Sequence, residues 1–293
     1  MGYLSEAMNR ADGSDPQDLG AAPSHRSETG LRLAGLDDAA PPPEDAPPGP
    51  SEPRRGPSVA TDPAERVDKR LVLISNPTGV LAEEYRALRT SLLARGNHRR
   101  HLVHTITSAC ASEGKTITTL NLGFSLSELP DQRILVVEGD LRLPRFASLL
   151  DLPQRPGLAQ VLCGSCDLSR AVRRLGGSNM SILPAGPPAK EQAVRLLSSS
   201  AARNLIKRLR SKYDHVIVDT PPVVELADAG ILGALSDEVI LVVKMQRTPR
   251  PLIEQAIRVL ANYNAPVAGL IATGEANKHH GYYHQYERLA KAA

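Results

Sequence analysis

The pattern of hydrophobic and polar positions divides the chain into a first stretch without periodicity and a longer, regular remainder. From about residue 70, short runs of β-branched and apolar residues alternate with longer amphipathic segments. Several short runs are apolar at every position, which is typical of strands covered by helices on both faces. The predicted strands are Leu102–Thr107, Arg133–Glu138, Ser181–Pro184, His215–Asp219, Glu238–Lys244 and Val267–Ala272.

The segments between these runs repeat their apolar positions at helical spacing. The predicted helices are Leu81–Ala94, Lys115–Glu128, Ala201–Lys212, Glu225–Gly233 and Arg250–Asn262. This alternation predicts an α/β fold of the P-loop NTPase type, with a doubly wound, mostly parallel sheet and helices on both faces. The order of the strands does not follow from the sequence.

Residues 1–66 differ from the rest in composition. They hold 11 of the 24 prolines and 12 acidic against 6 basic residues, so they carry a net charge of −6 and residues 67–293 carry +9. A segment with so few apolar residues buries too little surface to offset its conformational entropy. We therefore expect a disordered, Pro-rich acidic tail at 1–66, followed by one α/β domain at 67–293.

Composition also bears on location and partners. The sequence has no apolar window of the roughly 20 residues that span a bilayer, and its start lacks the features of a secretory signal. Three cysteines suit a reducing compartment. We therefore expect a cytoplasmic protein without a membrane span. The basic residues form no dense stripe, so nucleic acid is not an expected partner.

A candidate phosphate-binding loop joins the first predicted strand to the next helix. Residues 107–116 read TSACASEGKT, which meets the pattern G-x-x-x-x-G-K-[ST] except that Ala109 replaces its first glycine. Lys115 would reach the β- and γ-phosphates of ATP, and the Thr116 hydroxyl would bind Mg²⁺. The residues predicted to bind the nucleotide are Ala111, Ser112, Glu113, Gly114, Lys115, Thr116 and Ile117.

Two later strands end in carboxylates. Glu138 and Asp140 follow the run ILVV, and Asp219 closes the run HVIV. Ligands bind at the carboxyl edge of an open α/β sheet, so Thr116, Asp140 and Asp219 are the predicted Mg²⁺ ligands. Alternatively, the two aspartates only cap helices or turns. Three such sites at strand ends favour nucleotide binding.

Five stretches, within about residues 73–288, resemble the bacterial tyrosine kinase family, the cytoplasmic partners of exopolysaccharide and capsule export. AEEYRALRTSL resembles its oligomerisation signature, and ITSACASEGKTITTLNLG its Walker A region. VVEGDLRLPR resembles the additional acidic motif called Walker A′, and VIVDTPPVVELADAGILG resembles Walker B. The last stretch resembles a shortened C-terminal tyrosine cluster, made of Tyr282, Tyr283 and Tyr286.

The resemblance implies an ATP-dependent protein tyrosine autokinase that regulates exopolysaccharide or capsule synthesis and export. Its catalytic groups would be Lys115, Glu138, Asp140 and Asp219, with Glu138 or Asp140 accepting the proton of the tyrosine hydroxyl. The tyrosines of a neighbouring subunit in a ring would be the phosphoacceptors. The resemblance also implies an activator on a separate chain, a membrane polysaccharide co-polymerase, which would hold the kinase at the inner face of the plasma membrane.

The ring and the acceptors each have a plainer interpretation. We predict that Arg86 and Arg89 pair with Glu83 of the next subunit in a contact that can close a ring. Glu83 and Arg86 also stand at i and i+3, however, and could simply pair on one helix surface. Likewise, Tyr282 and Tyr286 have the spacing of one helical face and could pack a terminal helix.

Besides its shortened tyrosine cluster, the chain departs from the family pattern at three places. Ala111 and Ser112 stand where the family usually has Pro-Gly, so the loop lacks a residue that tolerates positive φ. Glu138 replaces an aspartate, and Thr273 stands where an asparagine associated with the adenine base is expected. These departures leave open a weak kinase, or one that binds ATP without transferring phosphate.

Two other classes of protein stay open. One is a deviant-Walker switch ATPase of the partition or division type. Such proteins usually carry a second lysine near position 110, where this chain has Cys110. The other is a non-catalytic adaptor that binds nucleotide and a membrane partner, and nothing in the sequence excludes it.

Overall fold

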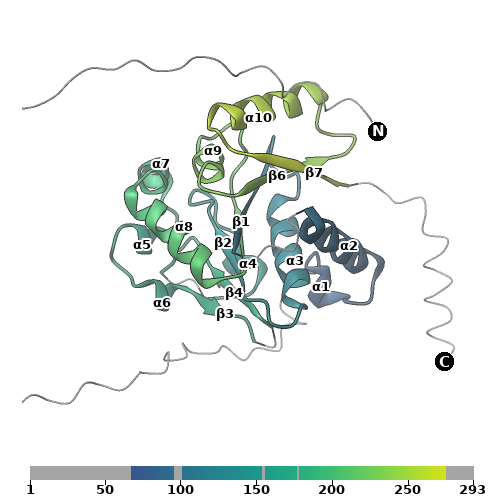
Figure 1. The fold of residues 1–293 in the computed structure, drawn as a ribbon, viewed down its shortest axis with the longest axis horizontal. Coiled ribbons are helices and arrows are strands. Elements are labelled where there is room, and N and C mark those ends of the chain that lie inside the picture. Colours follow the sequence, from purple (N-terminus) through teal and green to yellow (C-terminus); the bar gives the residue numbers. More distant parts are fainter. Residues whose placement is uncertain (1–66, 96–100, 154–155, 177, 275–293) are drawn as a thin grey trace, which may run out of the picture. The chain divides into compact units, whose positions relative to one another are not determined.

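The computed structural model describes residues 67–95, 101–153, 156–176 and 178–274. Within them lies a seven-stranded sheet of order β3-β4-β2-β5-β1-β6-β7 (Figure 1). Neighbouring strands are parallel except for β3 and β4. The strands are β1 (Leu102–Ser108), β2 (Ile134–Glu138), β3 (Arg173–Arg174), β4 (Met180–Leu183), β5 (His215–Asp219), β6 (Glu238–Lys244) and β7 (Val267–Thr273).

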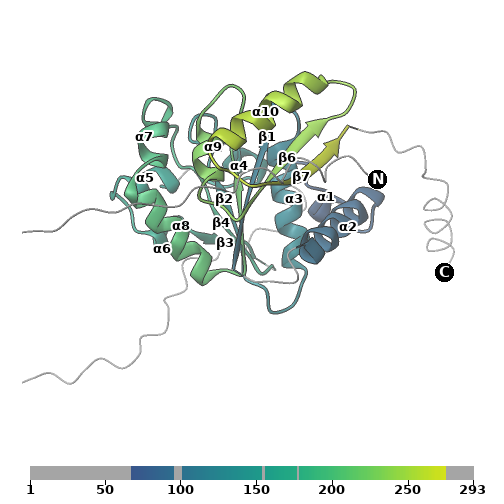
Figure 2. The same ribbon diagram turned by 45° about the horizontal axis from the view of Figure 1, so that its top comes forward.

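Helices cover both faces of this sheet (Figures 1 and 2). The longer ones are α2 (Val80–Arg95), α3 (Lys115–Ser127), α8 (Ser200–Lys212), α9 (Asp228–Gly233) and α10 (Arg250–Asn262). The apolar run of β5 contributes to both layers. Val216 and Val218 pack in a core with residues of α8, and Ile217 packs in a second core with α2 and α3. The predicted doubly wound α/β fold is confirmed.

The six predicted strands agree with the structure to within one residue at each end. The helix predicted from Glu225 begins only at Asp228. The sequence analysis missed β3 and the short helices, which have too few residues to show a period. These helices are α1 (Val72–Ser75), α4 (Phe146–Leu149), α5 (Leu158–Leu162), α6 (Leu168–Ala171), η1 (Lys190–Gln192) and α7 (Ala193–Leu197).

Some expectations concern segments outside the described residues. They are the acidic tail at 1–66 and the tyrosines Tyr282, Tyr283 and Tyr286. Where the chain is described, none of its helices is both long enough and apolar enough to cross a membrane.

Candidate functional site

Three neighbouring strands bring the predicted site residues to one edge of the sheet. β5 lies between β2 and β1, and the register places Asp219 beside both Glu138 and Ile106. The candidate phosphate loop follows β1 and leads into α3, whose first residues are Lys115 and Thr116. The loop and the acidic residues that the sequence singles out therefore share the carboxyl edge, where such folds bind ligands.

Two residues of the loop adopt left-handed backbone conformations. Gly114, directly before α3, has a φ of 92°, and Ser112 has a φ of 64°. A glycine adopts this conformation without strain, whereas another residue pays roughly 1–2 kcal/mol for it. The loop thus keeps its turn although Ala111 and Ser112 replace the Pro-Gly of the family pattern.

Asp219 and Thr116 contact each other directly. The Thr116 hydroxyl donates to Oδ2 of Asp219 over 2.8 Å, and the Thr119 hydroxyl lies 3.3 Å from Oδ1. Asp219 is 1% exposed. Burial raises the pKa of its carboxyl to about 7, although the Lys115 charge and the Thr116 hydrogen bond act in the opposite direction. The contact places a hydroxyl and a carboxylate oxygen side by side, next to a lysine.

Glu138 is a buried carboxylate, and both of its oxygens accept backbone hydrogen bonds. Its Oε1 accepts the backbone N–H groups of Arg145 and, over 2.7 Å, of Phe146 at the start of α4. Its Oε2 accepts the N–H of Ala185 over 2.9 Å. Burial raises the pKa of Glu138, and these three hydrogen bonds oppose the shift. Glu138 therefore fixes the chain that follows β2 and β4.

Asp140 is bonded differently. Its Oδ1 accepts the N–H groups of Arg142 and Leu143 over 3.1 and 3.0 Å, which closes a turn. The next residue but one, Arg142, also binds Asp228 in α9 through two hydrogen bonds of 2.7 and 3.1 Å. The sequence analysis missed this ion pair because the two residues are 86 positions apart.

A glycine separates the two acids after β2. The N–H of Gly139 donates to the backbone oxygen of Asp219 over 2.7 Å. A Cβ atom at position 139 would lie 2.7 Å from that same oxygen, which is closer than real Cβ atoms come. Only glycine lets the backbone between Glu138 and Asp140 approach β5 this closely.

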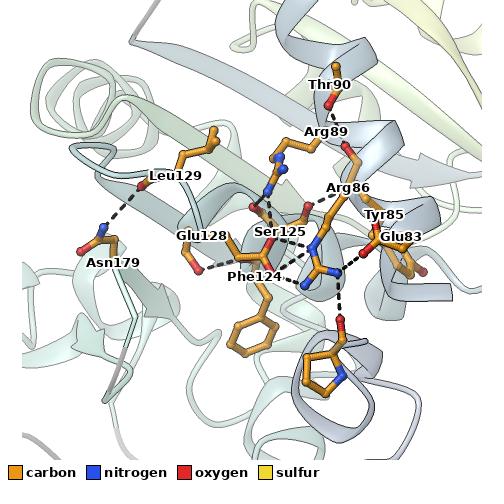
Figure 3. A network of polar contacts seen from close by, with 12 residues as sticks. Glu83, Tyr85, Arg86, Arg89, Thr90, Phe124, Ser125, Glu128, Leu129 and Asn179 are labelled. Carbon is orange, nitrogen blue, oxygen red and sulfur yellow. Dashed lines mark hydrogen bonds and ion pairs between the residues drawn. The ribbon is translucent and has the colours of Figure 1, made fainter. Parts of the chain in front are cut away.

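The residues of the predicted oligomerisation signature form a cluster between α2 and α3 (Figure 3). Arg86 binds Glu83 of its own helix over 2.6 Å and Glu128, at the end of α3, over 2.5 Å. Arg89 binds Glu128 over 2.8 Å and the backbone oxygen of Ser125 over 2.6 Å. Within one chain the same-helix pair is therefore present. The contact with a next subunit stays a prediction.

Glu128 is the member of this cluster that the sequence analysis missed. Arg86, followed by Arg89, holds the pKa of its carboxyl below the usual value. Its partners in α2 lie 39 and 42 residues away in the sequence, so no local spacing reveals them. We call Glu83, Arg86, Arg89 and Glu128 the arginine–glutamate cluster.

The match to known proteins covers most of the described residues. Residues 106–264 match the AAA domain family. The tyrosine-protein kinase YwqD of Bacillus subtilis is 30% identical over 221 residues, which make up 75% of this chain and 92% of YwqD. The chain belongs to the bacterial tyrosine-protein kinase family. The resemblance seen in the motifs is thereby confirmed.

Other members of the family differ in length from this chain. The kinase domain of the Escherichia coli tyrosine kinase ETK superimposes with a TM-score of 0.68 at 25% identity, covering 71% of this chain and 81% of that domain. The succinoglycan biosynthesis transport protein ExoP of Rhizobium meliloti is 28% identical over 235 residues, or 79% of this chain. These residues make up only 29% of ExoP.

Proposed function

We propose that the chain is an ATP-dependent protein tyrosine kinase that acts at the carboxyl edge of its sheet. The observation that carries the proposal is the hydrogen bond between Thr116 and Asp219, next to Lys115 at the start of α3. In P-loop proteins a hydroxyl and a strand-end aspartate hold Mg²⁺ opposite the phosphates. Membership of a tyrosine kinase family supplies the reaction class.

The residues at this edge fit ATP and Mg²⁺. Thr116, Asp140 and Asp219 offer hydroxyl and carboxylate oxygens, the ligands that Mg²⁺ prefers. Among the residues that the structure describes, no three His, Cys, Asp or Glu side chains are grouped to hold a metal alone. Phosphate and water oxygens would therefore complete the shell. The ion, when bound, would neutralise charge on the phosphates.

The side chains of the site would divide the remaining work. Lys115 and the loop N–H groups would hold the phosphates and stabilise the charge that develops during transfer. Asp140 would accept the proton of the tyrosine hydroxyl. We prefer it to Glu138 because three backbone N–H groups already occupy both oxygens of Glu138.

The proposal extends to the acceptor and the partners. Tyr282, Tyr283 and Tyr286 of a neighbouring subunit would receive the phosphate, within a ring of copies of this chain. A membrane polysaccharide co-polymerase on a separate chain would activate the kinase and keep it at the cytoplasmic face of the plasma membrane. Support comes from ExoP, whose name places a relative in succinoglycan biosynthesis and transport. The kinase would thereby regulate exopolysaccharide or capsule synthesis and export.

Mass spectrometry of the purified chain tests the activity. The wild-type chain and Lys115→Met would be incubated with Mg²⁺ and ATP, and phosphotyrosine would be mapped. We expect phosphate on the C-terminal tyrosines of the wild type and of the control Lys69→Met, which changes an exposed lysine, and none on those of Lys115→Met. ATP binding without phosphotyrosine, even with the membrane partner added, would contradict the kinase and favour an adaptor or a switch ATPase.

Light scattering tests the ring separately. An Arg86→Ala, Arg89→Ala double variant removes both arginines of the arginine–glutamate cluster. We expect its molar mass to fall to that of a single chain. A mass equal to that of the wild type at the same protein concentration would exclude a ring held by these residues.

A further inference from the structure

Glu113 is a buried carboxylate inside the phosphate loop. It is 2% exposed, and its Oε2 accepts the backbone N–H of Cys110 over 2.8 Å. Its Oε1 accepts the hydroxyl of Thr248. A negative charge within a loop that binds phosphate repels the ligand unless it is held away and neutralised by donors. The two hydrogen bonds do this, one at each oxygen of the carboxylate.

Thr248 reaches the loop from a different part of the sheet. It lies between β6 and α10, and its N–H donates to the backbone oxygen of Lys244 over 3.0 Å. The next residue, Pro249, is the N-cap of α10 and has an extended backbone. The position of Thr248 is therefore set by two regular elements, so its hydroxyl is a fixed donor for Glu113.

Thr273 makes a second contact with the same residue of the loop. It is the last residue of β7, and its hydroxyl donates to the backbone oxygen of Glu113 over 2.7 Å. Its side chain also lies beside Gly114, where an added Cβ would come within 3.7 Å of the Thr273 methyl group. In this chain the hydroxyl of Thr273 thus orients the phosphate loop.

We propose that Thr248 and Thr273 are positioning residues for the phosphate loop, with Thr248 holding the Glu113 carboxylate and Thr273 its backbone. This inference rests on the proposed function, because it takes a nucleotide to be the ligand of the loop. Thr248 lies in the loop after β6 and Thr273 at the end of β7, 25 residues apart in the sequence. They act through Glu113 and need not touch the ligand.

The two threonines should contribute unequally to nucleotide binding. Replacing Thr248 by valine keeps the shape of the side chain but leaves one oxygen of a buried carboxylate without its donor. The Glu113 carboxylate is then either held less firmly in its present position or rotates toward the phosphates of the nucleotide. Both outcomes weaken nucleotide binding. Replacing Thr273 by valine removes hydrogen bonds to neutral carbonyls only, those of Glu113 and, over 3.4 Å, Val243, which has a smaller effect.

Nucleotide affinity tests the proposal on the purified full-length chain. The probe is a fluorescent ATP analogue with Mg²⁺, and the melting temperature of each variant is measured alongside. We expect Thr248→Val to raise the dissociation constant about tenfold and Thr273→Val about threefold. Thr248→Ser keeps the hydroxyl and should bind like the wild type. Thr90→Val, which removes an exposed hydroxyl bonded to a backbone oxygen of α2, is the matched control.

A double variant separates positioning from simple packing. If Thr248 acts by holding the charge of Glu113, Glu113→Gln should restore part of the affinity lost in Thr248→Val, because the neutral amide does not repel phosphate. A lower melting temperature with unchanged affinity in Thr248→Val would overturn the inference. So would losses that simply add in the double variant. A wild-type chain that binds no nucleotide would overturn the proposed function itself, and this inference with it.

Discussion

Two glutamates stand at the two ends of helix α3, and the protein treats them in opposite ways. Glu113, just before the helix, is buried and bonded to a backbone N–H and a threonine hydroxyl. Glu128, just after the helix, is about one-third exposed and bonded to two arginines. The side chains are chemically identical, so the difference arises from the surroundings alone.

The contrast shows how burial decides what a carboxylate contributes. Around Glu128, water competes with the arginines and salt screens their charges, so each ion pair adds little to stability. Around the buried Glu113 no water replaces a lost donor, so an unsatisfied hydrogen-bonding group costs its full desolvation free energy. We therefore expect the Glu113 end of α3 to respond strongly to mutation and the Glu128 end to respond weakly.

The largest effect should come from Glu113→Ala. It leaves the buried N–H of Cys110 and the hydroxyl of Thr248 without an acceptor. The free energy of unfolding should therefore fall by about 2–4 kcal/mol. Urea denaturation would measure this loss. Glu191→Ala, at an exposed position of η1, should leave the midpoint unchanged. A loss below that of Glu128→Ala would contradict the comparison.

Ser112→Gly should raise the stability of the folded protein. Ser112 has a φ of 64°, and glycine relieves that strain at the cost of a more flexible unfolded chain. The net gain should be about 0.5–1 kcal/mol. Its neighbour Ala111 gives a matched control, because it does not belong to the described residues with a positive φ. Ala111→Gly should therefore lower the stability of the fold by a similar amount. Equal signs for the two variants in thermal unfolding would refute the strain argument.

An effect of similar size but opposite sign is expected from Glu128→Gln. The variant keeps the shape of the side chain but weakens the ion pairs with Arg86 and Arg89, so stability should fall by about 0.5–1 kcal/mol. The difference from the wild type should shrink as salt rises from about 0.1 M to about 1 M. The effect of Glu113→Ala should not depend on salt. A salt-independent loss in Glu128→Gln would show that its environment is as dry as that of Glu113.

The smallest effect concerns pH. The two arginines lower the pKa of Glu128 in the folded state, so the folded state binds a proton there less readily than the unfolded chain. The stabilisation is therefore present above the unfolded value of about 4.3 and is lost as pH falls through the folded pKa. The stability difference between wild type and Glu128→Gln should disappear in that acidic range. A constant difference down to pH values below about 3 would contradict this.

The sequence predicts the local features of this site and misses the contacts between distant segments. The phosphate loop and the strand-end acids, such as Asp219, follow from short runs whose chemistry and position in a strand are local. Thr248 and Glu128 do not, because their partners lie 135 and about 40 residues away. No periodicity records which loop of a parallel sheet meets which other loop. The strand order decides this, and the sequence does not reveal it.

The resemblance also points to residues whose local surroundings it does not describe. It marks Glu138 as one of two acids, but not that three backbone N–H groups already occupy its oxygens. It marks Arg86 and Arg89 as a surface for other subunits, but not that both already bind a carboxylate of their own chain. A motif gives the residue type that a site needs. The free bonding capacity of that residue depends on the packed structure.

The close approach at Gly139 has a consequence for the tolerance of the site. The distance between β2 and β5 at the acidic edge is set by a contact between main-chain atoms, which rotamer changes cannot alter. The spacing of the acids is thus already present before any ligand arrives. In a library that randomises position 139, every side chain would force two central strands apart, so the selected sequences should contain glycine there even where neighbouring positions vary freely.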